Sequence, residues 1–336
     1  MQIAKTFIFY SCLLLLSSCK EKDFLSDFEK NALFSPPTTT ELDSMIIRWR
    51  KQNFLPHDYM ILQEKTILNG KFTFKILSFD VNGIKEYGAL LIPQSDEPMP
   101  VRLYIGGFGL GETTNSLNLV VDSSTLNNPY ILAIPALRGQ SLAITLNGTL
   151  YSAPRAEGEH CDAFDGATDD ALALLNLIQV TELKADVNRS SIRGGSRGAT
   201  VALLAGIRDK RIKRVVGVVG PTDFLVLTER HQNDPTYQCQ FLNDLKDKKI
   251  SLTEARRKLL SSSPLYFARY LPATQLHMGL KDKNVPIEQG YTMEQKMMQL
   301  GLSSKFQLFT YDRGHTDIAT DNPELADRIA QFLSTL

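Results

Sequence analysis

Residues 59–93 alternate between apolar and polar side chains with a period of two. Within this region the pairs Asn69-Gly70 and Asn82-Gly83 each separate two strand-like runs. An Asn-Gly pair between alternating runs is a strong signal of a tight β-hairpin, because both residues tolerate positive φ angles. The pattern therefore predicts two successive hairpins that form an antiparallel edge of a larger sheet.

From residue 101 onward, short apolar runs alternate with helical patterns. The expected strands are residues 101–105, 130–135, 192–194, 214–219, 271–278 and 306–311, and the expected helices are residues 169–183, the segment after Ser196, residues 287–300 and residues 323–333. Such alternation indicates an α/β fold with a mostly parallel sheet and helices on both faces. We find no internal repeat, and we expect a single domain over residues 41–336.

The first residues of the chain follow another pattern. Lys5 precedes an apolar run that is too short to span a membrane and ends in Leu16-Ser17-Ser18-Cys19. This arrangement predicts a secretory signal, and its ending resembles the bacterial lipobox, in which the cysteine is lipidated. A plain signal peptide cleaved nearby and a short uncleaved anchor are the alternatives. We expect a signal peptide over residues 1–18 and a lipid on Cys19.

This interpretation places the protein in the cell envelope, anchored by lipid and either facing the periplasm or exposed at the surface. Residues 19–40 are polar and contain Ser35-Pro36-Pro37 followed by three threonines. That composition is typical of a linker, so we expect a tether between the lipid and the folded domain.

Composition excludes some partners. The chain has 37 basic and 37 acidic residues and no run of like charge, so nucleic acid is not expected as a partner. Of its four cysteines, Cys12 would leave with the signal and Cys19 would carry lipid, which leaves Cys161 and Cys239 as a possible disulfide in an oxidising compartment. Their sequence neighbourhoods lack the ligand spacing of a zinc site, so no metal is expected.

The candidate chemistry centres on Ser196. Residues 194–198 contain the pattern G-x-S-x-G, with a strand-like run before it and a small-residue helical pattern after it. In a nucleophile elbow the serine occupies a sharp strand-to-helix turn, and its neighbours are small so that strand and helix can approach closely. The alternative is an ordinary glycine-rich turn, because the motif is short enough to occur by chance.

A serine hydroxyl becomes a good nucleophile only when a histidine accepts its proton, and a carboxylate must orient that histidine. In α/β sheets of this kind the chain order is serine, acid, histidine. Three histidines follow Ser196. His231 lies in a polar stretch and His277 lies inside an apolar run, whereas His315 follows the last expected strand and a turn. His315 is therefore the expected base.

Two aspartates are candidates for the acid. Asp282 lies in the loop after the strand that ends near Met278, and Asp223 lies in the loop after the preceding strand. The chain order and the pairing with His315 favour Asp282. Asp223 remains the alternative.

Together these segments resemble the catalytic domain of the prolyl-oligopeptidase group of α/β-hydrolases. The resemblance extends over residues 84–333, and it rests on the elbow, Ser263-Pro264-Leu265-Tyr266, residues 271–286 around Asp282, and Tyr311, Gly314 and His315. It implies an α/β-hydrolase fold in which Ser196 is the nucleophile, Asp282 the orienting acid and His315 the general base. The chain departs from the group in two ways: it has no segment for a β-propeller, and Arg197 follows the serine.

The oxyanion of an acyl-transfer intermediate needs preorganised hydrogen-bond donors. One expected donor is the backbone N–H of Arg197. The glycine-rich loop after residues 101–105 resembles the Tyr-Gly-Gly-Phe segment of prolyl oligopeptidases, but Ile105 stands where the group has a tyrosine hydroxyl. The second donor is therefore expected to be the backbone N–H of Gly107 or Phe108.

The sequence thus predicts a serine hydrolase that cleaves an acyl bond, an ester in preference to a peptide, without a metal or organic cofactor. Its expected substrate is a small-molecule, glycan or peptide acyl compound, and its expected contact with the membrane is the lipid anchor. The polar loops over residues 135–140 and 155–170 are expected to border the pocket. A serine peptidase and a non-catalytic binding protein on the same fold are the alternatives.

Overall fold

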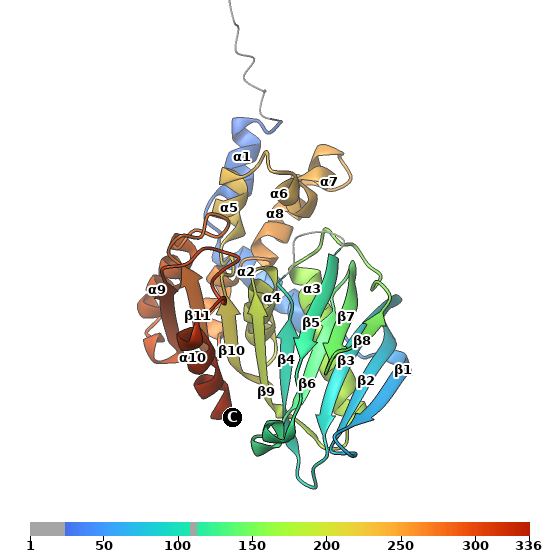
Figure 1. The fold of residues 1–336 in the computed structure, drawn as a ribbon. Helices are drawn as coiled ribbons and strands as arrows, with labels where there is room; N and C mark the ends of the chain where they lie inside the picture. The colour runs from blue at the N-terminus through green and yellow to red at the C-terminus, as the bar shows by residue number, and fades with distance from the viewer. Residues whose placement is uncertain (1–23, 108–112) are drawn as a thin grey trace, which may run out of the picture.

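The computed structural model describes residues 24–107 and 113–336. Within them, the main element is a nine-stranded sheet in the order β1-β2-β3-β6-β4-β9-β10-β11-β12 (Figure 1). The strands are β1 (His57–Ile67), β2 (Phe72–Val81), β3 (Ile84–Pro93), β4 (Met99–Ile105), β6 (Ile131–Ala136), β9 (Ala185–Gly195), β10 (Ile212–Val218), β11 (Ala273–Gly279) and β12 (Phe306–Tyr311).

The antiparallel edge of this sheet is the predicted pair of hairpins. β1 pairs with β2 and β2 with β3, and at the two turns Asn69 and Asn82 adopt positive φ angles of 57° and 52°. β6 then pairs antiparallel with β3, and every neighbouring pair from β6 to β12 is parallel. The prediction of a mostly parallel sheet with antiparallel N-terminal hairpins is confirmed.

Helices cover both faces of the sheet, and their positions follow from the period-two alternation of the strands. On β10, Val215 packs into a core with α2, α3, α4, α8 and α9, whereas its neighbour Val216 packs on the other face against α10. The helices are α1 (Asp27–Phe34), α2 (Thr39–Lys51), α3 (Asp165–Thr181), α4 (Arg197–Arg208), α5 (Phe224–Arg230), α6 (Pro235–Tyr237), α7 (Asn243–Lys246), α8 (Leu252–Ser261), α9 (Glu288–Gln299) and α10 (Pro323–Ser334). Among the described residues, no helix is both long enough and apolar enough to cross a bilayer.

A small second sheet was not predicted. It has the order β5-β7-β8, formed by β5 (Thr113–Leu119), β7 (Gln140–Leu146) and β8 (Thr149–Ala153). Leu142, Ile144 and Leu146 of β7 pack with Phe72 and Phe74 of β2 in one hydrophobic cluster, so this sheet covers one face of the antiparallel strands.

The part of the expected tether that the structure describes is folded onto the domain. Leu25 and Leu33 are buried, and α1 begins with a capping box between Ser26 and Glu29. The Arg256 guanidinium of α8 donates hydrogen bonds to the carbonyl oxygen of Leu33 and to other groups of this segment. The prediction that residues 19–40 form a tether is therefore wrong for residues 24–38. This segment contains a capped helix, and Leu25 and Leu33 pack in the core. Residues 1–18 and Cys19 lie outside the described residues.

Candidate active site

Ser196 occupies the sharp turn between β9 and α4. Its backbone has φ 51° and ψ −122°, a conformation that is strained for a residue with a side chain. The serine N–H donates to the carbonyl oxygen of Val218, at 2.8 Å. A β-carbon at Gly198 would lie 2.5 Å from the carbonyl oxygen of Ile105, so the close approach of α4 to β4 requires glycine there. These contacts hold the strained turn and project its hydroxyl beyond the sheet.

Two further loops bring their side chains to this hydroxyl. His315, after β12, places Nε2 2.8 Å from the Ser196 Oγ, and its Nδ1 lies 2.7 Å from Oδ2 of Asp282, after β11. The Asp282 side chain is fully buried, and its Oδ1 accepts the backbone N–H groups of Asn284 and Val285 at 2.8 Å each. With Nδ1–H donating to the carboxylate, Nε2 is available to accept the serine proton.

Asp223 lies elsewhere in the structure. It is the N-cap of α5, and its Oδ1 accepts hydrogen bonds from the N–H groups of Leu225 and Val226 and from the Tyr266 hydroxyl, the last at 2.9 Å. Burial raises the pKa of its carboxyl. The structure therefore brings Asp282, and not Asp223, to the imidazole of His315.

His277 is fully buried on β11. Its Nδ1 lies 2.9 Å from the Tyr311 hydroxyl, and its Nε2 lies 3.3 Å from Oε1 of Gln275. Burial lowers the pKa of His277 to about 3, so the ring is neutral at pH 7 with both nitrogens hydrogen-bonded. This is the satisfied core histidine that the apolar run around it indicates.

Two of the expected oxyanion donors, Arg197 and Gly107, lie beside the serine. Arg197 is the first residue of α4, so its backbone N–H has no acceptor within the helix and lies at the positive end of the helix dipole. Gly107 follows β4, and a β-carbon on it would lie 2.4 Å from the carbonyl oxygen of Gly195. The backbone at Gly107 thus packs directly on the elbow. Phe108 lies outside the described residues.

A polar cavity of about 530 Å³ opens in front of the serine. It is lined by Gly107, Ser196, Arg197, Pro221, His231, Asp234, Thr236, Tyr237, Lys283, Asn284, Val285, His315 and Thr316. Sequence patterns did not reveal the part formed by residues 231–237, because these residues lie in a polar stretch without periodicity. His231 lines the cavity, but the histidine that contacts both Ser196 and Asp282 is His315.

The loops expected to border the pocket contribute none of these lining residues. Instead, Arg138 of the first loop is nearly buried between two carboxylates. Its NH2 group lies 2.7 Å from Oδ1 of Asp170, and its NH1 group lies 2.9 Å from Oδ2 of Asp162. A buried guanidinium needs charged partners to offset desolvation, and the second loop supplies them. The two loops therefore stabilise each other through these ion pairs.

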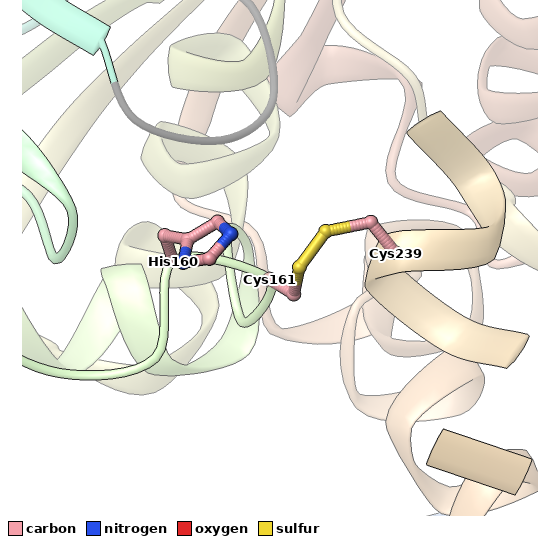
Figure 2. A group of neighbouring side chains, drawn as sticks. All are labelled: His160, Cys161 and Cys239. Atoms are coloured by element: carbon pink, nitrogen blue, oxygen red, sulfur yellow. A yellow bond between two sulfur atoms is a disulfide. The ribbon is translucent and has the colours of Figure 1, made fainter. Parts of the chain in front are cut away.

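Among the described residues, side chains able to hold a metal gather at two further places: His57 with Asp58 and Asp80, and His160 with Cys161 and Cys239. The ligand atoms of His160, Cys161 and Cys239 lie within 4.8 Å of one another. However, the two cysteines form a disulfide with a Cα–Cα distance of 5.4 Å, which joins the loop before α3 to a π-helical segment, η2 (Gln238–Leu242) (Figure 2). Metal coordination by cysteine requires a thiolate, so these sulfurs are not metal ligands while they are paired.

Residues 165–336 match the model of the prolyl oligopeptidase family. This span is more than half of the chain and contains Ser196, Asp282 and His315. The chain belongs to the prolyl oligopeptidase family. Membership of this family, together with the hydrogen-bonded serine, histidine and aspartate, identifies a serine hydrolase.

Solved structures with a similar fold include esterases and peptidases. Acetyl xylan esterase 1 from Thermoanaerobacterium sp. JW/SL YS485 is 14% identical with a TM-score of 0.65, over 92% of this chain and 97% of that one. The acetyl xylan esterase from Paenibacillus sp. R4 is 16% identical with a TM-score of 0.61, over 93% and 99%. The acylaminoacyl peptidase from Pyrococcus horikoshii is 14% identical with a TM-score of 0.54, over 82% and 48%. No curated protein sequence matches the chain.

Proposed function

We propose that this prolyl oligopeptidase family member is an esterase that removes small acyl groups, such as acetyl, from a hydroxyl-rich substrate. The observation that carries the proposal is the hydrogen-bonded line from the Ser196 hydroxyl through His315 to the buried carboxylate of Asp282. This line ends in a cavity large enough for several sugar-sized groups and rich in polar side chains.

In the proposed reaction, His315 Nε2 accepts the serine proton as Oγ attacks the ester carbonyl. The negative charge on the carbonyl oxygen is stabilised by the N–H of Arg197 and by an N–H of the loop at Gly107, and Asp282 stabilises the imidazolium. Collapse of the intermediate breaks the bond to the alkoxide, which takes the proton from His315. Water, activated by the same imidazole, then releases the acyl group from Ser196.

Two features favour an ester over a peptide. Ile105, where related peptidases have a tyrosine, is a fully buried hydrocarbon side chain and cannot donate to an oxyanion. The chain also spans nearly the whole length of the two acetyl xylan esterases but only about half of the acylaminoacyl peptidase. An alkoxide leaves more readily than an amine, so backbone donors alone suffice for an ester. Peptide hydrolysis is the second candidate, and the family match supports it.

We also propose that the protein acts in the cell envelope, exported by residues 1–18 and anchored through lipid on Cys19. The support is the lipobox-like ending of the apolar run, together with a disulfide, which persists in oxidising compartments. A Cys19→Ser variant should leave the membrane fraction and enter the soluble envelope fraction. If the variant still sediments with membranes as the parent does, the lipid-anchor proposal is wrong.

The hydrolase proposal is tested by labelling the full chain with a fluorophosphonate and by measuring hydrolysis of 4-nitrophenyl acetate. We expect both reactions in the parent and in Ser152→Ala, a control on β8 away from the cavity, and neither in Ser196→Ala or His315→Ala. Labelling or hydrolysis that survives in Ser196→Ala would place the nucleophile elsewhere.

A further inference from the structure

Residues 231–237, here called the cleft wall, form one side of the cavity through His231, Asp234, Thr236 and Tyr237. The hydrogen bonds within this segment are local. The Asp234 side chain caps α6 by accepting the Thr236 N–H at 2.8 Å, and the rings of His231 and Tyr237 stack with their centroids 5.2 Å apart. Residues 233–236 are exposed. Tyr237 packs against the main core, and the N–H of His231 donates to the carbonyl oxygen of Leu227 at 3.0 Å. An anchor beyond Tyr237 would add to these contacts in fixing the exposed residues relative to Ser196.

Such an anchor follows immediately in the chain. Cys239 lies two residues after Tyr237 and forms the disulfide with Cys161, in the loop before α3 (Figure 2). Beside it, Gln240 is buried, and its Oε1 accepts the N–H of Ala163 at 2.9 Å. A covalent bond and a buried hydrogen bond thus join the end of the cleft wall to residues 161–163.

The same short loop is bonded to the nucleophile elbow. The carbonyl oxygen of Ala163 accepts a hydrogen bond from Nε of Arg197, at 3.1 Å. Arg197 is fully buried and directly follows Ser196. The connection therefore runs from the cleft wall through Gln240 and Ala163 to the residue beside the nucleophile, and every polar contact in it is shielded from water.

We propose that the Cys161–Cys239 disulfide and Gln240 are positioning residues that fix the cleft wall against the elbow and so set the affinity for bulky acyl substrates. The proposal deepens the esterase function and rests on it. A thiol reductant would supply two electrons and two protons, convert the disulfide to two thiols, and remove the covalent anchor. The cleft wall then also adopts positions that do not contact the substrate. KM rises in inverse proportion to the fraction of molecules whose cleft wall remains in the binding position.

The test compares the full-length parent with Cys161→Ser/Cys239→Ser and with Gln240→Met, which keeps the disulfide. Substrates are 4-nitrophenyl acetate, which is small, and acetylated xylotriose, which fills more of the cavity. For the variants we expect KM for acetylated xylotriose to rise about fivefold or more, a change of about 1 kcal/mol in binding, with kcat within about twofold. Kinetic constants for 4-nitrophenyl acetate should change by less than about twofold.

Treating the parent with dithiothreitol should raise KM for acetylated xylotriose in the same way, whereas dithiothreitol should leave the KM of the double serine variant unchanged. Unchanged KM for the large substrate, or an equal loss of kcat on both substrates, would overturn the proposal. Labelling rates with diisopropyl fluorophosphate and with a biotin-tailed fluorophosphonate give a readout that needs no ester turnover. A slower rate for the tailed probe alone supports the anchor even if neither ester is a substrate, and equal rates in parent and variants contradict it.

Discussion

The assignment of the acid makes a sharp prediction about two aspartates. Asp282 and Asp223 both follow parallel strands, and both are buried carboxylates that accept backbone N–H groups. Only Asp282 contacts the imidazole of His315. Replacing each by asparagine removes the charge with almost no change of shape, so the pair Asp282→Asn and Asp223→Asn is a matched comparison.

The structure determines how the Asp282→Asn side chain must be oriented. Oδ1 accepts the N–H groups of Asn284 and Val285, so the amide oxygen of asparagine must stay there and its NH₂ group must face His315. That group donates to Nδ1, which moves the imidazole proton to Nε2 and leaves no base for Ser196. Loss of the correct tautomer in a serine triad lowers kcat about 10⁴-fold, which is about 5.5 kcal/mol of transition-state stabilisation.

Asp223→Asn can keep its oxygen where Oδ1 accepts from Leu225, Val226 and Tyr266. We expect kcat within about threefold of the parent and a loss of about 1 kcal/mol in the free energy of unfolding, because the bonds to a charged acceptor become neutral ones. The assay is steady-state hydrolysis of 4-nitrophenyl acetate, with circular dichroism to verify folding. If Asp223→Asn lost more activity than Asp282→Asn, the acid assignment would be wrong.

Three further predictions concern the elbow, the core and the disulfide. Gly107→Ala would force a β-carbon to within 2.4 Å of the Gly195 carbonyl, so we expect kcat to fall about a hundredfold with KM little changed, measured on the same ester. Neutral burial of His277 stabilises the fold above pH 6.5, the unfolded value, and this contribution is lost as the pH falls toward about 3, at up to about 1.4 kcal/mol per pH unit. Urea unfolding of His277→Gln should show a weaker decline than the parent between pH 6.5 and pH 4, and parallel declines would contradict this. The disulfide closes a sequence separation of 78 residues, so its reduction should lower the melting temperature by roughly 5–10 °C, and an unchanged value would show that it stabilises nothing.

The sequence predicted the elements that short-range patterns determine, namely turns and the period of apolar residues. The Asn-Gly turns and the alternation of strands and helices determine the main sheet, because backbone preference and burial agree at those positions. The line of Ser196, Asp282 and His315 was predictable for a different reason. Parallel strands end at one edge of the sheet, so residues that follow different strands come together there.

Features that depend on contacts distant in sequence were not predictable in this way. The sequence around β7 does not show what its apolar residues pack against. In the structure they pack with Phe72 and Phe74 of β2, which are distant in sequence. Arg138 was expected at the pocket because it lies in a polar loop. Its ion pairs with Asp162 and Asp170 could not be predicted, since these residues lie 24 and 32 positions further along the chain. The cleft wall has no periodic pattern, and only the folded chain brings it to the same cavity as Ser196.

The most direct test of the esterase function is kcat/KM for small acetyl esters against prolyl and alanyl peptide substrates, measured with one preparation of the full chain under one set of conditions. The buried Ile105 side chain and the backbone-only oxyanion donors lead us to expect higher values for the esters. Peptides hydrolysed as efficiently as the esters, or more so, would contradict the proposal and favour a peptidase.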